Sequence, residues 1–390
     1  MKIIEVKNNA VDFLTVQEIN KFDSRKYIPF GAENQAPQTF SLLGRTVLNH
    51  RALLNSKTRY TSGSDIFDVN GEPVINVNNN GQSLHEISKR LIFDEFDIGN
   101  AYLELVTDSK SSFLQFYHIG GTTGRLAKDL KSVFFHPTWR NVNITNDKDI
   151  VEIPIYPVFK QEGALRRSVV RISQYEPEFI NGIPSWYAGL RTAVISGLID
   201  ESNKSELENS HAISGMLYVP GNLSDDEAEE VQSAVDDTMT GAKNAGKLRV
   251  GYYDGRDGAK PEMIDFRKNI EGNYINLNKL SDDKMLLIHS WYRSLAGYQD
   301  PTGFDTNRII DEYKVALNTS IVPKQNEYLN IFNPILKQFN LPEIEYINKS
   351  PVTRFDTEDM LQVWEWREKN KMPFDKENIA QQKFMFEINK

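Results

Sequence analysis

The segment with the strongest chemical signal is Gly241-Ala-Lys-Asn-Ala-Gly246-Lys247, which nearly matches a phosphate-binding loop. In such a loop a Ser or Thr follows the lysine and ligates magnesium, but here Leu248 stands in that place. A true loop of this kind also follows a strand and opens a helix, whereas this one follows a predicted helix and precedes a predicted strand. The segment therefore predicts a turn rather than a nucleotide site.

A second cluster, which could indicate a metal-dependent nuclease, is acidic: Asp225, Asp226, Glu227, Glu229 and Glu230. Ser224 and Glu227 have the spacing of a capping box, which places three of these acids in the first turn of a helix. Negative charge is favourable there because it opposes the positive end of the helix dipole. No histidine or distant aspartate completes a recognisable ligand set, so the pattern favours a solvated helix face.

The histidines are scattered singly, without the spacing of a metal site: His50, His85, His118, His136, His211 and His289. No Gly-x-Ser-x-Gly nucleophile motif is present, and Gly120 to Gly124 is a flexible turn with nothing beside it to bind phosphate specifically. The sequence thus predicts no catalytic residues, no metal and no cofactor, which is typical of a protein that is not an enzyme.

Composition sets the broad class. The 390 residues are 39% hydrophobic and 25% charged, enough for a buried core in two or three domains. No apolar run approaches ~18 residues and the first residues lack a signal-peptide core, so we expect no membrane contact. Zero cysteines exclude disulfides and fit assembly in a reducing host cytoplasm. The net charge of -9 argues against a protein that grips nucleic acid through its phosphates.

The elements between Ile183 and Phe266 predict an excursion from a core and back. A helix from Pro184 to about Ser210 is apolar at its start and polar on every side from Asp200 onward, so it needs water or other subunits around it. A small α/β module follows, with strands over 213–219, 248–253 and 262–266 and a helix over 224–240. A return helix then begins near Gly272.

The region before the excursion reads as α+β. We expect helices over 39–60 and 83–98, and a hairpin over 65–77 around Asn70-Gly71. Gly99-Asn100 then leads into a strand over 101–106. Short strands follow over 113–117, 132–135, 150–159 and 168–172. The first 37 residues carry no periodicity and resemble an arm.

After the return helix, Ser281-Asp282-Asp283 predicts the start of a further helix to Leu295. A flexible loop from Ala296 to Phe304 separates it from a long helix that begins at Asp305 or Thr306. Pro323 removes a hydrogen bond from that helix and predicts a kink, or else two ordinary helices that meet there. Beyond it we expect a loop and possible strand over 339–350 and a short helix over 357–370.

This order of elements, with the phrases GMLYVPGNLSDDEAEEV and GAKNAGKLRV and with Gly99-Asn-Ala-Tyr102, resembles the portal proteins of tailed bacteriophages, of the type found in phages with the common bacteriophage capsid fold. The resemblance covers roughly residues 38 to 340. It implies an α+β subunit in these parts: N-terminal arm 1–37, wing 38–183, stem helix 184–210, small α/β clip 211–268, stem return helix and following helix 269–295, tunnel loop 296–305, kinked wing helix 306–340, and helical C-terminal crown or wing extension 341–390.

The resemblance also implies a function. Such proteins form a ring of twelve subunits at one vertex of the virion capsid, through which double-stranded DNA is packaged and ejected. The implied partners are the terminase large subunit, the major capsid protein and head-completion or adaptor proteins. Another virion head-tail connector is the main alternative, and a metal-dependent nuclease a lesser one.

Residue roles follow from the resemblance in the same way. The tunnel loop that faces the DNA comprises Gly297, Tyr298, Gln299, Asp300, Thr302, Gly303 and Phe304; Tyr298 and Phe304 either plug the bore or anchor the loop. The residues expected to line the stem channel are Glu201, Lys204, Glu206 and Glu208. Those expected to dock partners at the clip are Asp225, Asp226, Glu229, Lys243 and Lys247.

Overall fold

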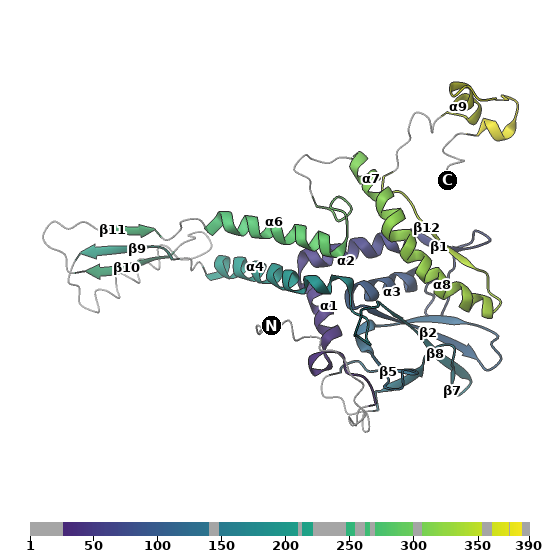
Figure 1. Cartoon of the computed structure of the whole chain (residues 1–390), viewed down its shortest axis with the longest axis horizontal. Coiled ribbons are helices and arrows are strands. Elements are labelled where there is room, and N and C mark those ends of the chain that lie inside the picture. The colour runs from purple at the N-terminus through teal and green to yellow at the C-terminus, as the bar shows by residue number, and fades with distance from the viewer. Residues whose placement is uncertain are drawn as a thin grey trace.

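The computed structural model describes residues 26–139, 148–209, 213–220, 247–253, 262–265, 270–298, 306–352, 361–373 and 375–383. The chain forms a body of helices and antiparallel sheets, from which two long helices extend side by side (Figure 1). We call these two helices the stalk; three strands at its far end form the tip sheet. The mixture of helix and sheet confirms the α+β prediction.

The helical layer of the body contains α1 (Ala36–Thr46), α2 (Leu48–Thr61), α3 (Leu84–Ile98) and α8 (Val322–Gln338). The prediction of one helix over 39–60 is wrong, because the helix divides at Val47. This residue is extended, with φ of -97° and ψ of 111°, and its side chain is buried. A β-branched residue favours extended backbone, so a buried valine at position 47 is compatible with the break between α1 and α2.

The main sheet of the body has the antiparallel order β3-β2-β8-β7, with β2 (Asn100–Asp108), β3 (Gln115–Ile119), β7 (Lys160–Glu162) and β8 (Leu165–Ser173). A smaller sheet contains β4 (Gly124–Leu126), β5 (Ser132–Phe135) and β6 (Val151–Pro154). The helix predicted over 83–98 is present as α3, which begins with a capping box at Ser83 and ends at Gly99. Gly99 has a φ of +80°, and a Cβ there would lie 2.6 Å from the backbone of Ile183, so this tight passage into β2 requires glycine.

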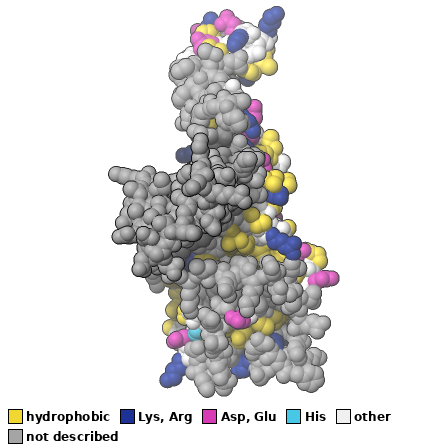
Figure 2. Space-filling view, turned by 90° about the vertical axis from the view of Figure 1, so that its left-hand side faces the viewer, with side chains coloured by type: hydrophobic (Ala, Val, Ile, Leu, Met, Phe, Trp, Pro, Cys, Tyr) yellow, Lys and Arg dark blue, Asp and Glu magenta, His cyan; other side chains and the backbone are white. Residues whose placement is uncertain are grey.

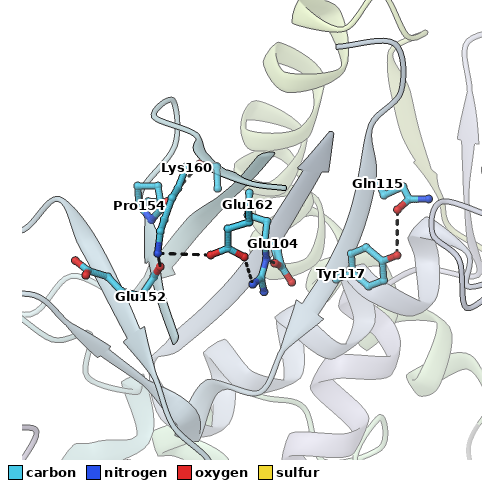
Figure 3. Close-up of polar contacts among 9 residues, drawn as sticks. Glu104, Gln115, Tyr117, Glu152, Pro154, Lys160 and Glu162 are labelled. Atoms are coloured by element: carbon cyan, nitrogen blue, oxygen red, sulfur yellow. Dashed lines mark hydrogen bonds and ion pairs between the residues drawn. The ribbon is translucent and has the colours of Figure 1, made fainter. Parts of the chain in front are cut away.

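Charged side chains fix the edge strand β7 to the main sheet (Figure 3). The Arg167 guanidinium bridges Glu104, at 2.5 Å, and Glu162, at 3.0 Å. Lys160 lies 3.5 Å from Glu162 and donates to the backbone carbonyl of Glu152. Charges of both signs on a short edge strand discourage pairing with another sheet.

The chain before α1 packs against the body through a buried arginine. The Arg125 guanidinium donates to the Asn34 side-chain oxygen at 2.6 Å and to the Asn34 backbone carbonyl at 2.7 Å. Tyr27, Ile28 and Phe30 are buried nearby in the core. The described end of the predicted N-terminal arm, from residue 26, is therefore part of the body.

The predicted hairpin over 65–77 is only partly correct. The turn is present, since the Gly71 N–H donates to the Asp68 carbonyl at 2.9 Å. However, β1 (Asp65–Asp68) forms its full ladder with β12 (Ile344–Ile347), which confirms the possible strand near 339–350. Across the turn, the Asp68 N–H donates to the Glu72 carbonyl at 2.8 Å and the Val74 N–H to the Ile66 carbonyl at 3.1 Å, which makes a single bridge between Phe67 and Pro73.

The stalk consists of α4 (Leu190–Asn209) and α6 (Ile270–His289). A 3-10 turn over Ser185–Gly189 precedes α4, so the α-helix begins later than the predicted Pro184. The prediction of two helices within 269–295 is wrong, because α6 is continuous and stops at His289. Ser281 is buried inside it and its hydroxyl has no hydrogen-bond partner among the described residues, so it does not act as a cap.

The tip sheet has the order β10-β9-β11, with β9 (Ile213–Pro220), β10 (Lys247–Tyr253) and β11 (Glu262–Asp265). The outer strands run parallel and antiparallel to β9, respectively. All three strands confirm the prediction for this module. The helix predicted over 224–240 lies outside the described residues.

Beyond the predicted tunnel loop, α7 (Thr306–Ala316) passes into α8 through a π-helical turn, Leu317–Ile321. Pro323 lies in the first turn of α8, directly after this turn. The hydrogen bonding of the helix is therefore irregular next to Pro323, where the sequence predicted a kink. Whether the helix axis bends there stays a prediction. Near the C-terminus, α9 (Val363–Lys369) is shorter than the helix predicted over 357–370 and packs on the 3-10 turn Ile379–Gln382.

Candidate functional site at the stalk and its root

The stalk leaves apolar side chains uncovered. Ile195 and Leu198 on α4 are 50% and 57% exposed, and Leu280 and Leu287 on α6 are 51% and 77% exposed. Spacings of three and seven residues place each pair on one face of its helix. Seen from the side of the tip, hydrophobic side chains lie open on the surface of the described residues (Figure 2). These stripes make the stalk a candidate contact surface.

The end of α6 packs tightly on the 3-10 turn that precedes α4. A Cβ on Gly189 of this turn would lie 2.1 Å from the Ile288 side chain, so a larger residue would force Ile288 to move. Trp186, in the same turn, is buried in the main core and its indole N–H donates to the Asp97 carbonyl. The root of the stalk is therefore held firmly by the body.

A buried histidine pair lies at this root. The His50 Nδ1 of α2 is 2.9 Å from the His289 Nε2 at the end of α6, and the Trp186 ring packs edge-on against His50. Burial, then the Arg51 charge, lowers the pKa of His50 from 6.5 to about 4. Burial, then His50 and Lys57, holds the pKa of His289 well below 6.5. Both rings are therefore neutral near pH 7.

A buried lysine caps α6 beside this pair. The Lys57 Nζ donates to the His289 carbonyl at 3.1 Å, which supplies a partner for an end-of-helix oxygen. Burial, then the neighbouring Lys324, lowers the pKa of Lys57 to about 8, while Glu95 opposes that shift. The negative end of the α6 dipole favours a cation at this position.

The start of the predicted tunnel loop is anchored to the same root. Tyr298 packs against a core cluster of stalk and body residues, and the Arg293 guanidinium lies 5.6 Å from the centre of its ring. Arg293 also pairs with Asp283 on α6. Of the two roles predicted for Tyr298, the geometry is that of an anchor.

The other side of the loop is tied to its start by a carboxylate. Glu312 of α7 accepts from the Ser294 N–H at 3.0 Å and from the Ser294 hydroxyl. Arg308 donates to the same carboxylate at 2.9 Å. The two ends of the loop are therefore clamped together, whatever path the loop takes between them.

The remaining predicted site residues are placed only in part. Gly297 has a φ of +84° with open space around it, as a loop hinge requires. The predicted stem residues Glu201, Lys204, Glu206 and Glu208 all lie on the outer half of α4, and Lys247 begins β10, but their side chains are outside the described set. Also outside it are Gln299, Asp300, Thr302, Gly303, Phe304, Asp225, Asp226, Glu229 and Lys243.

The described part of the chain shows neither a group of metal ligands nor a membrane-spanning helix. Within the described ranges, no three His, Asp or Glu side chains are grouped so that they could hold a metal ion. Among the helices described, none has the length and apolar character needed to cross a membrane.

Sequence reasoning missed the histidine pair and Glu312. The two histidines are 239 residues apart, so no local spacing joins them. Glu312 lies in a segment with an ordinary helical pattern, so nothing marked it as a contact of the loop. The position of His289 and Ser294, where the helical pattern ends before the loop, was the one feature of the sequence that could have pointed to these contacts.

Comparison with known proteins gives a fold but no family. No protein family model matches the chain, and no curated protein matches it. Solved structures do match: a chain in the virion of a native gene transfer agent particle has a TM-score of 0.54 at 13% identity, over 86% of this chain and 94% of that one. Chains in the neck of the empty particle, computed with C6 symmetry, and of the native particle, computed with C12 symmetry, give 0.55 at 14% and 0.54 at 13%. Each covers 87% of this chain and 95% of the matched chain. At this identity the likeness concerns the fold, so the chain has the fold of a protein in the virion and neck of a phage-like particle.

Proposed function

We propose that this chain is a portal-type head-tail connector: twelve copies form a ring at one capsid vertex, and double-stranded DNA passes along its axis during packaging and ejection. The observation that carries the proposal is the exposed apolar stripe on each stalk helix, at Ile195 and Leu198 and at Leu280 and Leu287. A two-helix stalk has no interior of its own in which to bury these side chains. Neighbouring copies around a ring would cover them.

The comparisons support this proposal. The fold match extends over nearly the whole length of the neck chains, and one of those necks was computed with C12 symmetry. The net charge of -9 per chain suits a conduit, because a ring of like charge would not hold DNA tightly as it slides. Under this proposal the chain has no enzymatic activity, and the ATPase that drives packaging is another protein.

Partners and location follow from the same proposal. The tip sheet and the segments around it would dock the terminase large subunit and later the head-completion or adaptor proteins, while the body would face the major capsid protein. The clamped loop would reach toward the bore from its anchor at Tyr298. The protein would assemble in the host cytoplasm and reside in the virion.

The test is to image the purified full chain by negative-stain electron microscopy and to measure its mass by light scattering. Twelvefold rings with a bore of ~20 Å or more are expected, and the double variant Leu198→Glu/Leu287→Glu should remain folded but stay monomeric, since each charge would be buried in the interface. Ile75→Glu is the matched control, because Ile75 is 61% exposed on the body. Rings that form equally well with the stalk charges would overturn the proposal.

A different connector is the second candidate, since another of the matched necks was computed with C6 symmetry. A sixfold ring, or one whose bore is too narrow for duplex DNA, would favour that role. The same images decide between the two, because rotational symmetry and bore are read from one set of averages.

A further inference from the structure

A groove of about 600 Å³ lies on the body between α2 and α3, away from the exposed stripes of the stalk. Its described lining is Ala52, Asn55, Ser56, Thr58, Arg59, Glu86, Lys89, Arg90, Phe93, Asp94, His118 and Ala296. The volume is that of a site for a small ligand or a few residues of a peptide. Nothing in the proposed function uses this groove.

The lining of the groove carries more positive than negative charge, with three cations against the two carboxylates Glu86 and Asp94. Arg59, Lys89 and Arg90 are exposed, and none of them forms an ion pair within 4.0 Å with a described residue. Arg90 instead faces the neutral side-chain amide of Gln82, at 3.1 Å once that amide is oriented to accept. This local excess of cations is opposite in sign to the net charge of -9 of the whole chain.

The two carboxylates in the groove are already used within the fold. Glu86 completes the capping box of α3 by accepting from the Ser83 N–H at 3.1 Å. Asp94 lies 2.7 Å from the His118 Nε2 and accepts from the Gly121 N–H at 2.7 Å. Both carboxylates keep their charge but make their hydrogen bonds elsewhere, so Arg59, Lys89 and Arg90 still have donors open to an incoming anion.

The lining of the groove also has an apolar part. Phe93 lies in it, with the Arg51 guanidinium 4.7 Å from the centre of its ring. Thr58 lines the groove as well, but it is 3% exposed and its Oγ1 is buried, so this hydroxyl is out of reach of a ligand. The charged side chains are therefore the groups that a polar ligand would contact.

We propose that this groove binds a short acidic segment of a partner protein. Carboxylates of the segment would pair with Arg59, Lys89 and Arg90. The stretch of α2 from Ala52 to Arg59 rises ~10 Å, enough for about three residues of extended chain. A pocket of this size does not admit duplex DNA, which favours a peptide over nucleic acid. This inference does not rest on the proposed function.

The experiment measures binding of a labelled eight-residue peptide of alternating glutamate and alanine to the full chain by fluorescence anisotropy. We expect the glutamate peptide to bind and the corresponding lysine peptide not to bind. The double variant Arg59→Gln/Lys89→Gln should raise the Kd about tenfold or more, because two charge-assisted contacts are lost. Lys337→Gln, which removes an exposed lysine from the last turn of α8, is the matched control and should leave the Kd unchanged.

Several results would overturn the inference. They are the absence of glutamate-peptide binding, an equal loss in the Lys337 control, and a Kd that the groove variants do not change. A labelled DNA duplex that binds in place of the peptide, with affinity lost in the groove variants, would assign the groove to nucleic acid instead. Ring formation is measured separately by electron microscopy, so failure of this inference leaves the proposed function intact, and the reverse also holds.

Discussion

The body and the stalk of this molecule bury their apolar side chains to different degrees. In the body, α3 and α8 pack on the main sheet, and Leu91, Leu103 and Phe332 are fully buried. Among the stalk side chains that the structure describes, four large aliphatic ones are at least half exposed, although the two helices pack along each other. A pair of helices covers one side of each partner at most. The body can thus be stable as a single chain, whereas the stalk is complete only when it is covered from outside.

The contrast does not extend to polar groups. The body buries ionisable groups and mostly gives them partners, as in the chain of contacts from Lys324 to Glu95 to Tyr328. Buried atoms without a hydrogen-bond partner among the described residues occur in both regions. Near the root of the stalk they are one oxygen of Asp97, one nitrogen of His50 and the hydroxyls of Ser281 and Tyr298, and in the rest of the body they belong to Asn34, Thr58, His85 and Arg171. Each such atom lowers the stability of the folded state.

The largest expected effect is in the core of the body. Phe332 is fully buried and its ring packs edge-on against Phe116 and beside Tyr328. Phe332→Ala should lower the free energy of unfolding by about 3 to 5 kcal/mol, because it removes buried apolar area and leaves a cavity. Chemical denaturation monitored by circular dichroism measures this. A loss below about 1 kcal/mol would mean that the helices do not form a tightly packed layer on the sheet.

A second prediction concerns Asp97, which is 2% exposed near the root. Burial, then the nearby Asp94, raises the pKa of its carboxyl from 3.8 to about 7. The folded chain therefore keeps a proton that the unfolded chain loses, and stability falls as pH rises from about 4 to about 7. Asp97→Asn should remove this slope and stabilise the chain at pH 8 by up to about 4 kcal/mol, with little change at pH 4.

Unfolding curves of Asp97→Asn and of the unmodified chain at pH 4, 6 and 8 test this. Asp65→Asn, a change to a partly exposed carboxyl on β1, is the control and should not alter the slope. Parallel pH profiles for the Asp97 variant and the unmodified chain would contradict the prediction.

The histidine pair predicts a dependence of opposite sign. His50 has a folded pKa of about 4, below its usual 6.5, so the unfolded chain binds a proton more readily. Stability should be full above pH 6.5 and should fall by about 3 kcal/mol as pH drops to 4. His50→Gln should flatten this acid limb. If the limb is as steep in the variant as in the unmodified chain, other groups cause it.

What the sequence could predict depended on how local each signal was. The helix over 83–98, its end at Gly99 and the strands of the tip module depend on neighbouring residues, and all of them were predicted. The pairing of β1 with β12 joins segments about 280 residues apart and left no local trace. Ser281-Asp-Asp was wrongly predicted as a helix start because these residue types are common at helix N-termini. In the folded chain Ser281 is buried and α6 continues through it, which depends on packing and not on residue type.

The candidate site likewise has features that local sequence predicts and contacts that it does not. Gly297 and Tyr298 were singled out because a break between helical patterns is visible in the sequence. The contacts that hold them, from Arg293 to Tyr298 and from Ser294 to Glu312, depend on the angle between α6 and α7. The direction of the Tyr298 side chain at that junction depends on tertiary packing. The sequence alone therefore could not decide whether Tyr298 anchors the loop or plugs the bore.

A smaller effect is expected at this anchor. Burial, then Asp282, raises the pKa of Tyr298 to about 12, and its hydroxyl has no hydrogen-bond partner in the described part of the chain. Tyr298→Phe should therefore leave stability unchanged or raise it by up to about 1 kcal/mol, since an unpaired hydroxyl is removed. Tyr298→Ala, which deletes the ring, should instead destabilise the chain. A loss of more than about 1 kcal/mol in the Phe variant would show that the hydroxyl has a partner in the folded state.

The smallest effect on the single chain is expected in the stalk. Leu287 is 77% exposed, so Leu287→Ser removes little buried area and should change the free energy of unfolding of the monomer by no more than about 0.5 kcal/mol. The control is Leu286→Ser, one position earlier on α6, where the side chain is buried and the loss should be several times larger. Both variants are measured by denaturation at a protein concentration low enough to keep the chain monomeric. Because the two leucines are adjacent on one helix, equal losses would mean that Leu287 is covered within its own chain, and the apolar stripe would then no longer require a neighbouring copy.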